Sequence, residues 1–182
     1  MEFNIRNKVC PCAGLAVLLS LIIVPKGYAA DNLQFRGNLV QGACSIRPGD
    51  EDIELTLREM TSKFIYRYTR SEGKPFSLHL ENCDTGIADS VTITFSGIEN
   101  PDLPGLLAVD AGSQASGIGV GLETLQSNPL PLEVASDEQA LITGNNVIEL
   151  QVYVKGEPQA ILDQSIVPGA FSASSTFTLG YP

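Results

Sequence analysis

The sequence contains a single histidine, no tryptophan, and 11 basic residues against 21 acidic ones in 182 residues. One histidine excludes any metal site or acid–base pair that needs two imidazoles. The formal net charge is −10. A protein this acidic lacks the positive surface that binding to nucleic acids requires, and anionic lipid repels it. No Gly-x-Ser-x-Gly elbow, phosphate-binding loop or His-Glu-x-x-His motif is present. We therefore predict no catalytic residue, metal ligand or cofactor, although a carboxylate pair acting on glycosides stays open because such residues meet only in the fold.

Two short clusters resemble ligand sites but lack the residues that these sites need. Gly117, Gly119 and Gly121 suggest a dinucleotide loop, but Leu122 occupies the place of its third glycine and no helix is expected after it. We interpret these glycines as a strand with a bare face, against which another backbone packs. The acidic run Asp50–Asp52 lacks the spacing and closing glutamate of a calcium loop, and we interpret it as a solvated turn.

The chain begins with the pattern of a secretory signal peptide. Two basic residues precede a twelve-residue apolar run, Ala13–Val24, and small residues follow at Gly27–Ala30. The run is too short to cross a membrane, which takes about 20 apolar residues. We expect cleavage after Ala29, with cleavage after Ala30 as the alternative, and therefore export.

Removal of the signal leaves two cysteines, Cys44 and Cys83. In an oxidising compartment such a pair is most simply one disulfide. The bond would close a loop of 40 residues and stabilise the fold by about 4 kcal/mol on the chain-entropy model. No Cys-x-x-Cys spacing is present, so a catalytic dithiol is not predicted.

Charge is unevenly distributed along the exported part. Of its 8 basic residues, seven lie between Arg36 and Lys74, whereas from Pro75 onward Lys155 is accompanied by 13 acidic residues. We interpret the second part as a solvated acidic surface, with a docking patch as the alternative. The basic stretch Met60–Lys74 is interpreted as an exposed loop, with a contact to a neighbouring molecule or a host ligand as the alternative.

Alternation of apolar and polar residues recurs along the exported chain, as expected of half-buried β-strands. Glycine, proline, asparagine and aspartate mark turns between the runs. The alternating runs are Leu33–Leu39, Ile53–Leu57, Phe76–Leu80, Val91–Phe95, Ile118–Leu122, Leu130–Val134, Val147–Val154 and Phe171–Tyr181. No stretch forms a convincing amphipathic helix, and Leu57–Arg70 is the nearest. We predict one all-β antiparallel sandwich or barrel, with His79 on an outer face and without a partner.

The two ends of the exported chain carry the most informative strands. One face of the first strand carries Leu33, Phe35, Gly37 and Leu39. One face of the last run, Gly169–Tyr181, carries Phe171, Ala173, Phe177, Leu179 and Tyr181. A terminal strand frays unless it pairs, and a long alternating edge strand is a template for strand addition. The pattern suggests a chain that offers a strand at one end and receives one elsewhere, and pairing of both ends inside one sandwich is the alternative.

In order and spacing, these features resemble a pilin subunit of the chaperone–usher fimbriae of Gram-negative bacteria, close to the type 1 and P fimbrial minor subunits. The matching segments are the signal peptide, Leu33–Leu39, Gly42–Ile46, Phe76–Asp84, Val91–Gly97, Gly169 as fourteenth residue from the end, and the penultimate Tyr181. The resemblance covers essentially all of the exported chain. It implies an incomplete immunoglobulin-like antiparallel β-sandwich whose missing strand leaves a hydrophobic groove. The implied organisation is a signal peptide (1–29), an N-terminal donor-strand extension (30–42) and a pilin domain (43–182).

The resemblance also implies partners and residue roles. A periplasmic chaperone would fill the groove with its own strand and hold the C-terminal carboxylate, and the extension of the next subunit would replace that strand at the outer-membrane usher. The implied donor residues are Leu33, Phe35, Gly37 and Leu39. The implied groove and chaperone contacts are Gly169, Phe171, Phe177, Leu179, Tyr181 and Pro182. A Cys44–Cys83 bond would pin the first two strands.

The expected function is therefore that of a structural, non-enzymatic subunit of a fimbria that supports cell adhesion at the bacterial surface. Such a subunit is expected to contact neighbouring pilins, without insertion into the membrane and without binding nucleic acid. One alternative is a tip adaptor or adhesin that contacts a host ligand. The other is a self-contained periplasmic β-sandwich binding module.

Overall fold

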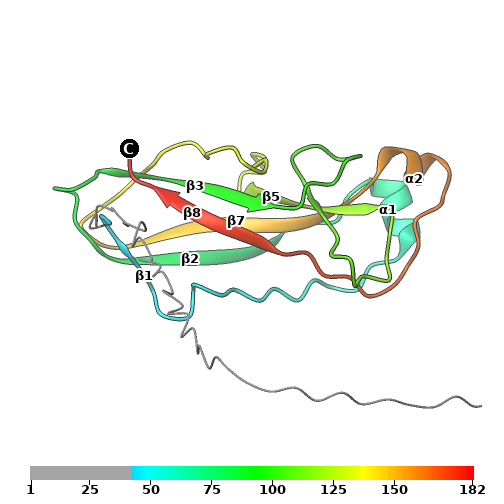
Figure 1. Ribbon diagram of the computed structural model, residues 1–182, viewed down its shortest axis with the longest axis horizontal. Helices are drawn as coiled ribbons and strands as arrows, with labels where there is room; N and C mark the ends of the chain where they lie inside the picture. Colours follow the sequence, from blue (N-terminus) through cyan, green and yellow to red (C-terminus); the bar gives the residue numbers. More distant parts are fainter. Residues whose placement is uncertain (1–41) are drawn as a thin grey trace, which may run out of the picture. The chain divides into compact units, whose positions relative to one another are not determined.

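The computed structural model describes residues 42–182, which belong to one compact unit. The predicted signal peptide and the donor residues Leu33, Phe35, Gly37 and Leu39 lie outside the described residues. Two antiparallel sheets face each other, with strand orders β1-β2-β7-β5-β4 and β6-β3-β8 (Figure 1). The fold is an all-β sandwich, as the alternating strands predict, and it is immunoglobulin-like, as the resemblance implies.

The long strands follow the alternating runs of the sequence. The strands are β1 (Ser45–Ile46), β2 (Lys74–Cys83), β3 (Ser90–Gly97), β4 (Leu107–Ala108), β5 (Ile118–Thr124), β6 (Gln139–Ala140), β7 (Gly144–Gly156) and β8 (Ser175–Gly180). The helices are α1 (Ser62–Tyr68) and α2 (Pro158–Leu162). The central strand β7 pairs with β2 on one side and with β5 on the other, which makes it the spine of the larger sheet.

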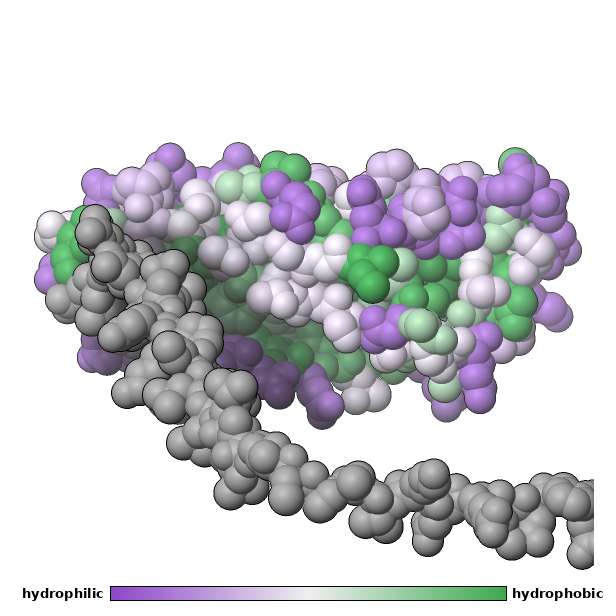
Figure 2. All heavy atoms as spheres, viewed as in Figure 1, coloured by the Kyte–Doolittle hydropathy of each residue, from purple (hydrophilic) through white to green (hydrophobic). Residues whose placement is uncertain are grey.

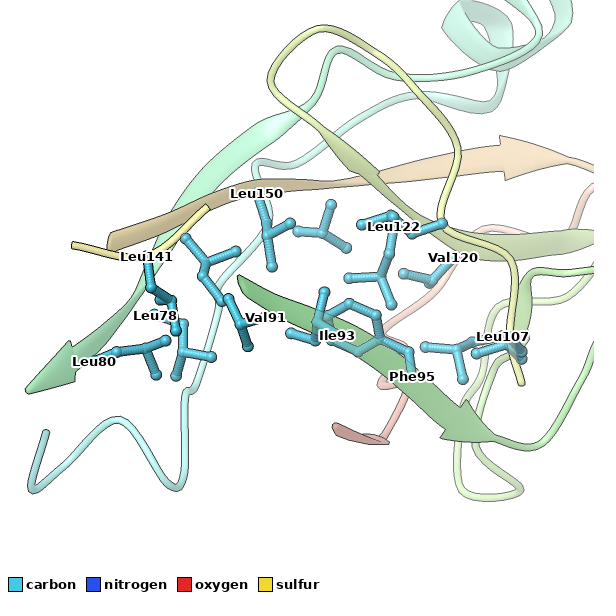
Figure 3. Close-up of a cluster of buried hydrophobic side chains, with 14 of the residues drawn as sticks. Leu78, Leu80, Val91, Ile93, Phe95, Leu107, Val120, Leu122, Leu141 and Leu150 are labelled. Atoms are coloured by element: carbon cyan, nitrogen blue, oxygen red, sulfur yellow. The ribbon is translucent and has the colours of Figure 1, made fainter. Parts of the chain in front are cut away.

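The core lies between the two sheets. Leu78 and Leu80 of β2, which are at most 1% exposed, pack in one cluster with Val91, Ile93 and Phe95 of β3. Figure 3 shows these side chains directed toward one another from the facing sheets. Each fully buried side chain of this kind stabilises the fold by about 1.5–3 kcal/mol. The cluster therefore holds the two sheets together.

The expectation that Leu57–Arg70 forms no convincing helix is wrong for α1. Thr61 begins α1 by accepting a first-turn backbone N–H at its hydroxyl (3.3 Å), and Thr69 ends it in a left-handed conformation with φ of 64°. The helix is held by packing of Ile65, which is 2% exposed, because two turns are too short to be stable on propensity alone. The five-residue α2, which has Pro158 in its first turn, was not expected either.

The run Leu130–Val134 is not a strand, contrary to expectation. Residues 130–134 form a loop in which Leu130 and Leu132 are buried, whereas Val134 is 53% exposed. The Leu130 N–H donates to the carbonyl of Leu122 (2.9 Å) rather than to a continuous ladder. Two buried leucines in a loop thus imitate the alternation of a strand.

The expected glycine-rich strand is present as β5, but what packs on its bare face is partly a side chain. A Cβ on Gly121 would lie 2.3 Å from the ring of Tyr153, and one on Gly119 would lie 3.1 Å from the carbonyl oxygen of Leu107. Larger residues at either position would displace these neighbours. The two glycines therefore allow Tyr153 and the backbone of Leu107 to pack closely against β5.

The expectation that His79 has no partner is wrong. Its ring nitrogen Nδ1 lies 2.7 Å from Oδ2 of Asp50, and the same oxygen accepts the backbone N–H of His79 at 2.7 Å. The stretch Asp50–Asp52 is thus only partly a solvated turn, because Asp50 is tied to β2. Alternation predicts the face on which a side chain lies, but it does not reveal a partner that comes from a distant loop.

Candidate strand-accepting groove

Strand β8 has an open edge. It pairs with β3 from Thr92↔Gly180 to Gly97↔Ser175, and no strand within residues 42–182 pairs with its other side. Phe177 and Leu179 are half-buried and pack against the main core cluster. The edge therefore offers unpaired backbone groups next to an apolar surface, which favours addition of another strand.

Residues 51–60 form the opposite rim. Ile53, Leu55 and Leu57 are half-buried and pack against the core, while the residues between them are exposed. Within the described part of the chain, residues 51–60 form no backbone–backbone hydrogen bond. The Lys74 ammonium donates to the carbonyl of Thr56, which ties this rim to the start of β2. The segment is therefore a strand in its side-chain pattern but not in its backbone pairing.

Between these two rims lies a hollow that we call the acceptor groove. Figure 2 shows hydrophobic residues sunk below the surrounding surface, between β8 and the extended segment that precedes α1 in Figure 1. The apolar side chains that border it and pack on the core are Ile53, Leu55, Leu57, Phe171, Ala173, Phe177, Leu179 and Tyr181. An apolar groove with two unpaired backbone rims can hold an extended chain with alternating apolar residues.

One end of the groove, which we call the helix end, is formed at α1. A cavity of about 60 Å³ lies there, and its lining includes Met60, Ile65, Gly169 and Phe171. A Cβ on Gly169 would lie 2.6 Å from the Cβ of Gln114, so the chain approaches its neighbour too closely for a side chain at this position. The helix end can therefore accommodate a small additional apolar group.

The other end, which we call the disulfide end, contains the bond between Cys44 and Cys83. The bond joins the residue before β1 to the last residue of β2, as the resemblance implies. Tyr181 lies beside Gly42, whose Cβ would be 3.8 Å from the ring, and burial raises the pKa of Tyr181 above its ordinary value. The carbonyl of Ala43 accepts the N–H of Asp84 at 2.8 Å. Both the end of β8 and the start of the described chain thus lie at the disulfide end.

The hydrogen bonds of Asp50 fix the start of the 51–60 rim. The backbone N–H of His79, and then its ring, donate to the carboxylate and lower the pKa of Asp50 below its ordinary value. Because β2 is part of the larger sheet, this contact holds the rim at a defined position beside the groove.

The residues predicted from the sequence take distinct places. Phe171, Phe177, Leu179 and Tyr181 border the groove on the β8 side, and Gly169 lies at the helix end. The final residue, Pro182, is exposed. Only residues 175–180 of the predicted last run form a β-strand. The chain before Ser175 forms backbone hydrogen bonds with residues 110–116 instead of pairing with β3.

Sequence reasoning missed the second rim and the cavity. The alternation of Ile53, Leu55 and Leu57 predicts a strand, and nothing in the sequence shows that its backbone stays unpaired. Met60 and Ile65 were missed because the cavity combines a short helix with two distant loops.

No helix in the described part of the chain, residues 42–182, is long and apolar enough to cross a membrane. Over the same residues, no group of three or more histidine, cysteine or acidic side chains is arranged to hold a metal ion. The groove itself presents unpaired backbone groups and apolar side chains.

An open edge strand beside apolar side chains is a place where another β-strand can be added. Residues 33–182 match the family model described as fimbrial protein. The chain is 30% identical over 174 residues to the Fimbria A protein of Serratia marcescens, covering 92% of this chain and 95% of that protein. It is 31% identical over 173 residues to the putative minor fimbrial subunit PmfF of Proteus mirabilis, covering 91% and 95% of the two chains.

A third relative and a solved structure agree with this match. The chain is 31% identical over 174 residues to the fimbrial adapter PapK of Escherichia coli, covering 92% of this chain and 97% of the adapter. The crystal structure of the P pilus rod subunit PapA superposes with a TM-score of 0.67 at 21% identity, covering 78% of this chain and all of PapA. The chain belongs to the fimbrial protein family. It is a structural subunit of a fimbria and is exported to the cell surface.

Proposed function

We propose that the acceptor groove receives the N-terminal arm, residues 30–42, of a neighbouring copy or of a related subunit, and that repetition of this joint builds the fimbria. The observation that carries the proposal is the pair of unpaired rims, β8 and residues 51–60, on either side of an apolar hollow. The arm has the complementary pattern, with Leu33, Phe35 and Leu39 on one face.

The direction of the arm follows from the requirement that the assembly continue. The described chain begins at the disulfide end, where β8 also ends, so the arm is joined to the body there. An arm lying parallel to β8 would leave the groove at the disulfide end of the receiving subunit. The disulfide ends of the two subunits would then face each other and leave no room there for a further subunit, so growth would stop. An arm lying antiparallel to β8 leaves at the helix end and gives a head-to-tail contact that can repeat. The antiparallel arrangement places Leu39, the last apolar residue of the arm face, at the cavity beside Met60.

The energy available is sufficient for a long-lived joint. Burial of three large apolar side chains, Leu33, Phe35 and Leu39, contributes about 5–9 kcal/mol in total. Each backbone hydrogen bond to β8 or to the opposite rim adds about 0.5–1.5 kcal/mol. Ordering of the arm opposes these gains, so the sum is an upper value.

Before assembly, the groove would be covered by a strand of a periplasmic chaperone, and an outer-membrane usher would be the place where the arm replaces it. The open edge of β8, with its half-buried apolar side chains, supports this step, because an open apolar edge strand is a site of aggregation. The chaperone would also hold the C-terminal carboxylate. That carboxylate belongs to Pro182, which is exposed and follows Tyr181 at the disulfide end.

A steric block of the groove tests the proposal. Ala173 borders the groove and packs on the core, whereas the next residue, Ser174, is exposed. We expect Ala173→Trp to abolish binding of a labelled peptide of residues 30–42 to the chaperone-delivered subunit, and Ser174→Trp to leave it unchanged. Fluorescence anisotropy of the peptide measures both. Equal binding to the two variants would contradict the proposal.

A further inference from the structure

The connections at the two ends of strand β2 have opposite character. Helix α1 lies between the 51–60 rim and the start of β2, at the helix end, and the turn Asp84–Asp89 follows the end of β2, at the disulfide end. Since β2 has ten residues, the two connections are separated by roughly 33 Å along the strand. Figure 1 shows α1 and the β2–β3 turn at opposite ends of the sandwich.

The outer face of α1 is basic and aromatic. Lys63 and Arg67 are four residues apart, on the side opposite the buried Ile65, and both are exposed. Phe64 and Tyr68 beside them are 36% and 54% exposed, and their ring centroids are 4.7 Å apart. Neither Lys63 nor Arg67 forms an ion pair with any residue between 42 and 182.

The turn Asp84–Asp89 carries the complementary groups. Asp84 and Asp89 are exposed and have no ion-pair partner in the described chain, and Ile87 between them is 48% exposed. The turn has a defined shape, because the Asp84 carboxylate accepts the N–H of Gly86 at 2.8 Å and the Asp84 carbonyl accepts the N–H of Ile87 at 3.0 Å. It therefore presents two carboxylates around one apolar side chain.

The length of the arm brings these two surfaces together. Only three residues, 40–42, separate Leu39 from Ala43, so their Cα atoms are at most about 14 Å apart. With Leu39 in the cavity lined by Ile65 of α1, the next subunit must begin close to that helix. Its Asp84–Asp89 turn is fixed to Ala43 by the backbone bond from Asp84.

We propose that the Asp84–Asp89 turn of each subunit docks on α1 of the subunit that receives its arm. The occupant of the α1 face is thus a second copy of this chain, with carboxylates against Lys63 and Arg67 and Ile87 against the exposed rings. This inference rests on the proposed function, because it needs the arm in the groove. The contact guides the incoming subunit by opposite charge and favours this end over the acidic disulfide end.

A charge-swap experiment tests the contact. The acceptor is the chaperone-delivered subunit without residues 30–39, so that it cannot donate. The donor is the mature chain whose own groove is closed by a second copy of residues 30–42, fused after Pro182 through a short linker; we call it the closed-groove subunit. The linker can be short because β8 ends where an antiparallel strand begins. Formation of the one-to-one joint is followed on a native gel and by light scattering.

We expect acceptor K63E/R67E, and separately donor D84N/D89K, to slow joining at low salt by about threefold or more. The two together should restore the rate. Asp84→Asn keeps the oxygen that accepts the Gly86 N–H, so the turn itself is preserved. The control donor, Glu149→Lys, reverses an exposed charge on β7 and should neither slow joining nor rescue the acceptor variant.

The free peptide 30–42 separates this inference from the proposed function. It should bind wild-type and K63E/R67E acceptors equally, because it carries the arm without the docking turn. Failure of the peptide to bind the wild-type acceptor overturns the groove. Normal peptide binding with equal joining rates for all donors and acceptors overturns the docking contact alone. An equal loss for peptide and whole donor also overturns it, since the charges would then act through the groove.

Discussion

Arg70 and Glu123, which are 53 residues apart, form a two-point ion pair, with Nη1 2.9 Å from Oε2 and Nη2 2.6 Å from Oε1. The side chain of Glu123 is 1% exposed, and Gln151 also donates to it at 2.8 Å. The guanidinium lies 3.7 Å from the centre of the Tyr153 ring, and its hydrogen bond to Glu123 raises the pKa of Arg70 above its ordinary value. The pair ties the chain after α1 to strand β5.

Removal of the arginine is expected to be costly. Arg70→Met leaves a buried carboxylate without its cation and should lower the free energy of unfolding by about 3–5 kcal/mol. Urea unfolding of the closed-groove subunit measures this. The control is Arg47→Met, which breaks the half-exposed pair of Arg47 with Glu81 and should cost about 1 kcal/mol or less. Similar losses for the two variants would show that the buried pair has no special role.

The hydrogen bonds between Asp50 and His79 predict that the stability of the fold falls at acidic pH. The pKa of Asp50 is lowered in the fold, so its contribution is present above the ordinary aspartate pKa of 3.8 and is lost as the pH falls below it. Asp50→Asn keeps an acceptor for the His79 N–H but does not titrate. We expect the variant to show a smaller loss of melting temperature between pH 5 and pH 3 than the wild type. Identical pH profiles of the two closed-groove subunits would refute this role.

The disulfide is expected to stabilise the disulfide end. The bond joins residues 39 apart in sequence, and the double substitution C44S/C83S should lower the free energy of unfolding by about 4 kcal/mol on the loop-entropy model. Urea unfolding of the closed-groove subunit gives the value. A change below about 1 kcal/mol would mean that the β1–β2 pairing does not need the cross-link.

The position of Gly37 in the arm predicts a steric effect on assembly. Gly37 shares a face with Leu33, Phe35 and Leu39, and we expect it to lie where the groove is shallow. Gly37→Leu should block donation while the subunit still folds with its chaperone. The matched control is Asn38→Leu, on the opposite face of the arm, which should polymerise at the wild-type rate. Polymerisation of the Gly37 variant at that same rate would sink the assignment of this face.

The sandwich could be predicted because its long strands carry their own signal. In β2 and β3, alternation places Leu78, Leu80, Val91, Ile93 and Phe95 in the core, and these residues are buried as expected. The apolar face of β8 was readable for the same reason. Period-two patterning is local, so a single sequence suffices to detect it.

The parts that were missed depend on contacts between distant segments. Helix α1 forms because Ile65 finds a buried site, and the leucines at 130 and 132 fill the core from a loop. The partners Asp50 for His79 and Glu123 for Arg70 come from other segments of the chain. The unpaired backbone of residues 51–60 has no sequence signature at all, since its side chains alternate like those of a paired strand.

Thermal unfolding of residues 43–182, alone and with an added strand, tests most directly whether this sandwich needs a segment from outside its own body. We expect the body alone to aggregate or to melt without a sharp transition, and the same residues with the strand 30–42 fused after Pro182 to melt cooperatively as a soluble monomer. A body that remains monomeric and melts at the same temperature with and without the strand of residues 30–42 would contradict the open groove as the basis of assembly.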